Sequence, residues 1–155
     1  AKAETIDNNL QHEIVKKMSS NSVYYGKLSE MLKKIIMQRK IEAMSYEEYL
    51  RQVVELAEAI LHPETSGSYP DGIKDSAARR ALYDHFEENF ELTIDVDGAI
   101  RVSIQPEWKR NFQKQQRIRL AIYRKLLLHS YSEDKATVET NEVFDIAQRQ
   151  EEYDA

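Results

Sequence analysis

The sequence predicts a mainly α-helical protein, and three observations lead to this expectation. Charged residues make up 32% of the 155 residues, against about 25% in an average domain. Glycine and proline are scarce, with four and three copies, which favours long helices. Apolar residues recur every three or four positions over most of the chain, as they do on the buried face of a helix. We expect an all-α fold, an irregular bundle of about six to seven helices.

Length and composition indicate one domain without disulfides. A chain of 155 residues is long enough to bury a core of its own, so we expect a single helical domain over 1–155. The absence of cysteine excludes disulfides and thiolate metal sites and favours a cytoplasmic protein. The chain has no apolar run of the about 20 residues that a membrane span needs, and no signal segment. It begins with Ala1 rather than Met, as expected of a fragment of a longer protein.

The first half of the chain predicts three helices in succession. Apolar residues at spacing four predict a short helix over 9–20, and a stronger pattern predicts a second helix over 22–44. Ser45 and Glu48 form a capping box, which predicts a third helix that continues to Leu61. Because almost no loop separates the second and third helices, we expect them to form an antiparallel pair.

A loop and a further helix follow. Residues 62–75 hold four of the seven glycine and proline residues of the chain, which predicts a loop. Asp75 or Ser76 then caps a helix that carries Ala78 and Phe86.

Residues 92–104 fit two structures. Apolar residues alternate on both sides of Asp97-Gly98, a dipeptide typical of hairpin turns, so the period alone favours a short β-hairpin at 92–104. A helix over the same range would use Leu92, Val96 and Ile100.

The last third of the chain predicts a long helix and an acidic tail. The helix is expected from about Glu107 to His129. From Glu133 to Ala155 there are eight acidic and two basic residues. We therefore expect 132–155 to be an acidic tail with one peripheral helix, dispensable for folding of the rest.

The long helix is basic on one side. From Lys109 to Lys125 there are seven basic residues and no acidic one. Five of them fall within an arc of about 100° on an ideal helix, opposite an apolar side. Such a segment in an acidic protein is typical of a surface that binds a polyanion or an acidic partner, although a solvated face has the same pattern. The predicted binding residues are Arg110, Lys114, Arg117, Arg124 and Lys125, with Arg79 and Arg80 on another helix extending the patch.

Arg119 lies on the other side of this helix. It projects from the middle of the apolar arc, so we expect its guanidinium to be buried and paired with a carboxylate. The candidate partners are Asp84, Glu87 and Glu91.

The sequence gives little support for an enzyme. No phosphate-binding glycine loop and no serine nucleophile motif occurs, and the four histidines share no metal-ligand spacing. One alternative is a Mg²⁺-dependent nuclease. Its carboxylates and lysine would be Asp95, Asp97, Glu107 and Lys109. Because Pro106 favours a helix start at Glu107, we expect no catalytic and no metal site.

Several segments, in order, resemble the C-terminal region of the motor (R) subunit of type I restriction enzymes. The resemblance covers roughly 28–127, and no single segment is specific. The matching stretches are Arg39-Lys40-Ile41-Glu42, Ser45-Tyr46-Glu47-Glu48-Tyr49-Leu50, Ala78-Arg79-Arg80-Ala81-Leu82-Tyr83-Asp84, Val96-Asp97-Gly98-Ala99-Ile100-Arg101, Trp108-Lys109-Arg110-Asn111 and Arg117-Ile118-Arg119-Leu120-Ala121-Ile122.

The resemblance implies a role in assembly and in the path of DNA. In that family the R subunit hydrolyses ATP to translocate DNA and then cuts it, and its helical C-terminal region helps attach it to the methyltransferase core. The implied partners are the modification and specificity subunits, DNA and the other domains of the R subunit. ATP and Mg²⁺ would belong to those other domains, so no cofactor is expected here. The resemblance also favours a helix at 92–104. The alternative from the residues alone is a stand-alone basic-helix nucleic-acid-binding domain.

Overall fold

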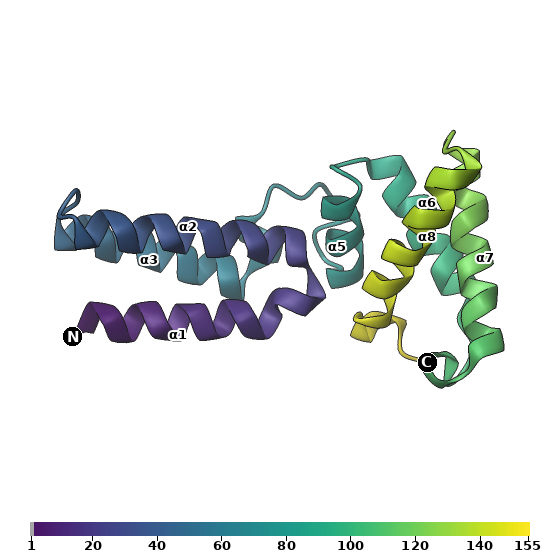
Figure 1. Cartoon of the computed structure of the whole chain (residues 1–155), viewed down its shortest axis with the longest axis horizontal. Helices are drawn as coiled ribbons and strands as arrows, with labels where there is room; N and C mark the ends of the chain where they lie inside the picture. The colour runs from purple at the N-terminus through teal and green to yellow at the C-terminus, as the bar shows by residue number, and fades with distance from the viewer. Residues whose placement is uncertain (1) are drawn as a thin grey trace. The chain divides into compact units, whose positions relative to one another are not determined.

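The computed structural model describes residues 2–155, and in that range it contains α-helices and short 3-10 turns but no strand (Figure 1). The expectation of an all-α fold is confirmed. The α-helices are α1 (Lys2–Lys17), α2 (Ser22–Lys40), α3 (Tyr46–Leu61), α4 (Pro63–Ser66), α5 (Ala77–His85), α6 (Phe90–Ser103), α7 (Phe112–Leu128) and α8 (Glu133–Gln148). The 3-10 turns are η1 (Met18–Ser20), η2 (Trp108–Arg110) and η3 (Glu151–Tyr153).

The chain divides into two compact units, Ala1–Lys74 and Asp75–Ala155. The length of the chain led us to expect one domain, whereas each unit has a hydrophobic core of its own. The boundary falls at the end of the segment rich in glycine and proline. Most of that segment is irregular, and it also contains the single turn of α4.

The first unit consists mainly of α1, α2 and α3, which lie side by side (Figure 1). Ser45 caps α3 as expected, because its hydroxyl accepts a hydrogen bond from the Glu48 backbone N–H at 3.1 Å. The Glu48 carboxylate instead accepts hydrogen bonds from Arg51 and Gln52. Asn21 caps α2 in the same way. Apolar residues of all three helices fill the core, among them Ile14, Leu28, Leu32, Tyr49, Val53, Leu56 and Ile60.

A buried aspartate ties α1 to both other helices of this unit. Asp7 is 5% exposed. Its carboxylate accepts hydrogen bonds from Arg39 on α2 at 2.5 Å and from the Tyr49 hydroxyl on α3 at 2.5 Å. The Arg39 guanidinium also lies 5.2 Å from the centre of the Tyr49 ring. Because a buried charge is tolerated only when it is paired, this arrangement sets how the three helices align.

The second unit is built around α7, which packs against α6 and α8. Each of these helices begins at a side-chain cap, from Asn89 for α6, Asn111 for α7 and Ser132 for α8. The core between them is apolar, and its members include Trp108, Phe144, Tyr153, Phe86, Leu82, Leu92, Ile100, Ile118, Ile122 and Leu126.

Of the two structures that fit residues 92–104, the hairpin favoured by the period is wrong and the helix favoured by the resemblance is confirmed, since this range lies within α6 and its C-terminal end. Leu92, Val96 and Ile100 are spaced by four and are at most 1% exposed, so the helical stripe faces the core. Gly98 lies on another face of α6, where an added Cβ would meet nothing within 4 Å. The Asp97-Gly98 dipeptide is therefore accommodated inside a helix, and burial of the helical stripe outweighs its preference for a turn.

The acidic C-terminal segment is not a peripheral tail. Helix α8 spans Glu133–Gln148 and packs along α7. Val143, Phe144 and Tyr153 are each at most 1% exposed and belong to the core of the second unit. The acidic residues of α8 separate its apolar residues in the sequence and so hide an apolar stripe in the composition. This stripe belongs to the core, whereas the dispensability of the segment for folding stays a prediction.

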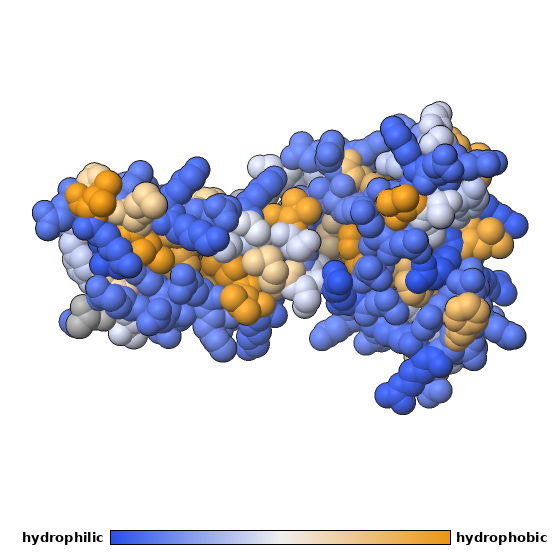
Figure 2. Space-filling model, in the orientation of Figure 1, coloured by the Kyte–Doolittle hydropathy of each residue, from blue (hydrophilic) through white to orange (hydrophobic). Residues whose placement is uncertain are grey.

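The surface of the protein is predominantly polar in the view of Figure 2, with separate groups of hydrophobic residues. Over residues 2–155, every helix is too short or too polar to cross a membrane.

Candidate functional site

The basic side of α7 is open to solvent, at least in part, at each of its cations. Lys114, Arg117, Arg124 and Lys125 lie on α7, within an arc of about 100°. Arg117 and Arg124 are exposed, and Lys114 and Lys125 are half-buried. Within residues 2–155, none of the four forms an ion pair with a carboxylate. We call these four residues the basic face of α7.

Arg110 does not share the helix with the others. The sequence suggested one helix from Glu107 onward, whereas the chain forms η2 and then an extended residue, Asn111, with φ −128° and ψ 113°. Arg110 is exposed, but its direction is not set by the period of α7. Lys114 is held at the start of the helix, where its ammonium donates to the Pro106 carbonyl at 2.5 Å. The free charge is therefore concentrated on Arg117, Arg124 and Lys125.

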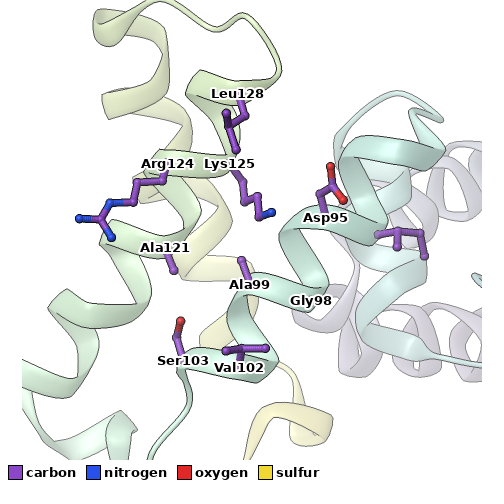
Figure 3. A pocket seen from close by; sticks show the side chains of 10 residues that line it. Asp95, Gly98, Ala99, Val102, Ser103, Ala121, Arg124, Lys125 and Leu128 are labelled. Atoms are coloured by element: carbon purple, nitrogen blue, oxygen red, sulfur yellow. The ribbon is translucent and has the colours of Figure 1, made fainter.

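A groove of about 570 Å³ runs beside these cations, between α6 and α7 (Figure 3). Small side chains form its floor, and larger apolar side chains stand at its edges. Val102 is 84% exposed and Leu128 is 75% exposed. We call this the α6/α7 groove, and it is lined by Ile94, Asp95, Gly98, Ala99, Val102, Ser103, Ala121, Arg124, Lys125 and Leu128.

The groove and the basic face belong to one surface. Ala121 and Leu128 fall between the cations around α7 by helical period. In Figure 3 Lys125 extends toward α6, whereas Arg124 extends away from it. Asp95, the acidic residue of the lining, is engaged by His129, whose Nε2 lies 2.6 Å from a carboxylate oxygen. The combination of an apolar floor with unpaired cations is suited to a macromolecule that carries both apolar and acidic groups.

Arg79 was expected to extend this basic surface, but it does not. Its Nε donates to the carboxylate of Asp97 at 2.8 Å, and Asp97 is fully buried. Arg80 is half-buried on the same helix and has interactions of its own. The charge of Arg79 is therefore paired with that of Asp97 inside the second unit.

Asp97 is the centre of a buried network. Besides Arg79, Arg101 donates to it at 3.0 Å and the Tyr153 hydroxyl donates at 2.6 Å. Burial raises the pKa of Tyr153, and the neighbouring Asp97 charge raises it further. Two guanidinium groups and one hydroxyl thus satisfy a carboxylate that has no contact with water.

Glu152 connects this network to the start of α5. It accepts hydrogen bonds from the Ser76 hydroxyl at 2.7 Å, from the Ala78 backbone N–H at 3.0 Å and from Arg101 at 2.8 Å. Partial burial acts to raise the pKa of Glu152, but these three hydrogen bonds together lower it. The C-terminal turn η3 is therefore fastened to both α5 and α6.

The four residues of the alternative nuclease site are not brought together. Asp97 is enclosed by arginines, and Asp95 is paired with His129. Glu107 is exposed at a left-handed position with φ 59°. Lys109 pairs with Asp154 and lies over the Trp108 ring at 5.6 Å. A metal bound by these carboxylates would need them on one side of a common cavity, which the described residues do not provide.

Arg119 has no carboxylate partner within residues 2–155, contrary to the expected ion pair. It is half-buried and donates to the amide oxygen of Asn141. Its guanidinium carbon lies 4.1 Å from the centre of the Phe144 ring. The residue covers the aromatic core with its flat face, as arginine does when it stacks on a ring.

We expect the Arg119→Met substitution to have a small effect. The contact with Phe144 contributes about 0.5–1 kcal/mol, the hydrogen bond to Asn141 contributes about 1 kcal/mol, and the methionine chain retains part of the packing. Thermal unfolding followed by the fluorescence of Trp108, the single tryptophan, measures this directly. A loss of about 3 kcal/mol or more would instead indicate a required ion pair.

One histidine cluster was not foreseen from the sequence. His85 on α5 pairs with Glu139 on α8, and Glu142 lies 3.8 Å from the same ring nitrogen. Their donor atoms lie within 4.8 Å of one another. The contact between His85 and Glu139 is a hydrogen bond between two helices, and we assign the cluster that structural role.

Parts of the site could have been read from the sequence, and others could not. The spacing of Arg117, Arg124 and Lys125 predicted their common side correctly. The groove was missed because Gly98, Ala99 and Ala121 have small side chains that give no periodic signal. It depends on the approach of two helices rather than on any motif.

Comparison of the chain with family models, curated proteins and solved structures returned no match, so the function is inferred from these residues and from the sequence resemblance.

Proposed function

We propose that this chain is a helical docking domain of a type I restriction motor subunit, which attaches the motor to the methyltransferase core and to DNA. The observation that carries the proposal is the basic face of α7, where Arg117, Arg124 and Lys125 are free of carboxylate partners within residues 2–155. Like charges on one helix repel one another. An acidic partner relieves that repulsion, and the ordered resemblance to the R subunit supports this class of assembly.

The apolar edge of the surface favours protein as the partner at this face. Val102 and Leu128 are largely exposed beside the cations. Phosphate contacts need cations alone, whereas a protein interface buries apolar side chains within a polar rim. The assigned partner of this face is therefore the modification or specificity subunit of the same enzyme.

A stand-alone nucleic-acid-binding domain is the second candidate, favoured by the same unpaired cations. Phosphate contacts add affinity without sequence information, so such a domain would bind DNA of any sequence. Strong binding of DNA in the absence of the methyltransferase, with a steep dependence on salt, would identify this second function.

We expect the double variant Arg117→Glu, Arg124→Glu to weaken binding to the purified methyltransferase core by about 10- to 100-fold at low salt, because it places like charges against an acidic surface. Any DNA affinity should fall too, with the salt slope flatter by about two units. Both residues are exposed and unpaired, so thermal unfolding should be unchanged. Titration by isothermal calorimetry measures the affinity.

The matched control is Lys27→Glu, Lys34→Glu on α2. These two lysines are also exposed and seven residues apart on one helix, so the variant has the same change in net charge. It should bind like the parent chain. Equal affinities for the two double variants, for both methyltransferase and DNA, would show that the basic face is only a solvated surface.

A further inference from the structure

We infer that the α6/α7 groove receives an acidic amphipathic helix, which inserts a large apolar side chain between α6 and α7 and places its carboxylates on Arg117, Arg124 and Lys125. The inference rests on the proposed docking function and names the chemistry of the docked segment.

The floor of the groove is open at the centre. Gly98 lies on α6 with open space beside it, since an added Cβ would meet no atom within 4 Å. Ala99 and Ala121 line the same groove from the two helices, and Figure 3 shows both side chains in the space between them. Small residues at facing positions leave a hole of the kind that a knob from a third helix fills.

The edges of the groove are apolar where such a knob would enter. Val102 on α6 is 84% exposed and Leu128 on α7 is 75% exposed, and both line the groove. Covering these two side chains removes apolar surface from water, which stabilises the complex in proportion to the area buried. Leu128 lies at one end of the groove and Val102 at the other (Figure 3), so successive apolar residues of the docked helix would contact Leu128, the alanine floor and Val102 in turn.

The charges select an acidic partner. Arg124 and Lys125 line the groove itself, and Arg117 lies one turn before Ala121 on the same side of α7. None of the three has a carboxylate partner within residues 2–155. Asp95 is already engaged by His129 at 2.6 Å, so the groove presents net positive charge. A helix with glutamates flanking its apolar stripe would complement these cations at the rim.

The secondary structure of the docked segment follows from the two helices, α6 and α7, that form the walls of the groove. An extended peptide usually binds by adding a strand to the edge of a sheet, and residues 2–155 contain no sheet. Two neighbouring helices instead offer an apolar channel between ridges of side chains, which an amphipathic helix fills with residues spaced by three and four. The groove therefore takes a helix.

The first test fills the groove from inside. The Gly98→Leu variant of the full chain puts a branched side chain into open space on α6, so it should fold with a melting temperature at or above that of the parent, because leucine favours helix over glycine. Its affinity for the purified methyltransferase core should fall about 10- to 100-fold, as when a central anchor is displaced. Gly26→Leu on α2 is the matched control, since Gly26 is also helical and also has open space.

The second test identifies the occupant. The chain has no cysteine, so the Val102→Cys variant carries a benzophenone label at one site beside the groove. Irradiation in the presence of the methyltransferase core and duplex DNA should attach the label to a protein segment of that core with net negative charge and helical spacing. The Val54→Cys variant, labelled at a residue that is 61% exposed on α3, should not react with the same segment.

The outcomes separate this inference from the proposed function. Binding that is lost in Gly98→Leu and kept in Gly26→Leu, with the cross-link on an acidic helix, supports both. Binding that survives Gly98→Leu overturns the groove inference and leaves the docking function standing. A cross-link to DNA, to a basic or extended segment or to a second copy of this chain also overturns it. A parent chain that does not bind the methyltransferase core overturns both.

Discussion

Replacement of Asp97 by alanine is expected to cost the second unit about 3–5 kcal/mol of unfolding free energy. The carboxylate is fully buried, and its removal leaves Arg79 and Arg101 side by side without their shared counter-charge. The hydroxyl of Tyr153 also loses its acceptor. Trp108 is the single tryptophan of the chain and belongs to the core of this unit, so its fluorescence during urea unfolding reports the loss.

The control for this substitution lies two residues away on the same helix. Asp95 is also an aspartate of α6 with a side-chain partner, His129, but its side chain is 46% exposed. Because solvent screens such a pair, Asp95→Ala should cost less than about 1 kcal/mol. Equal effects of the two substitutions would mean that the buried network around Asp97 does not stabilise the unit.

Removal of the last five residues, 151–155, is expected to destabilise the second unit by at least about 3–5 kcal/mol. The deletion takes away the buried Tyr153 ring and the acceptor of the Trp108 indole N–H, which donates to the Tyr153 carbonyl at 2.7 Å. It also removes Glu152, which caps the start of α5. Thermal unfolding should show a lower transition by Trp108 fluorescence.

A shorter deletion provides the comparison. A chain that ends at Asp154 keeps Tyr153, Glu152 and the ion pair between Lys109 and Asp154, so its stability should match the parent. If the five-residue deletion were as stable as this control, the contacts of η3 with α5 and α6 would not stabilise the second unit.

Local signals in the sequence predicted most of the helices correctly. The caps at Ser45 and Ser76 and the apolar spacing of α2 are present in the structure as predicted. Such signals depend on residues within one or two turns of each other. The basic face of α7 was predictable for the same reason.

The failures come from partners that are distant in the chain. Alternation around Asp97 resembled a hairpin, but the carboxylate finds Arg79 and Tyr153, which lie 18 and 56 positions away. Asn89 caps α6, because its side-chain oxygen accepts a hydrogen bond from the Leu92 backbone N–H. This cap was the local sequence signal that favoured a helix over a hairpin. Composition likewise concealed the core residues of α8, because the acidic residues between them dominate the average.

Ideal helix geometry also has a limit that Arg119 illustrates. Helical period placed its side chain toward the apolar side of α7, and the structure agrees that it covers the core. The period does not predict which residues lie opposite the side chain. Those residues are Asn141, through its amide oxygen, and Phe144, through its ring. The division of the chain into two units was missed for a related reason, since a segment rich in glycine and proline has the same composition within a domain as between two.

The most direct test of the docking function is the affinity of the parent chain for the methyltransferase core, measured by isothermal calorimetry with and without duplex DNA, beside its affinity for DNA alone. We expect binding to the core in the absence of DNA, weak binding to DNA alone, and loss of core binding in Arg117→Glu, Arg124→Glu but not in Lys27→Glu, Lys34→Glu. Strong binding to DNA alone, with no binding to the methyltransferase core, would contradict the assignment of this chain as a docking domain.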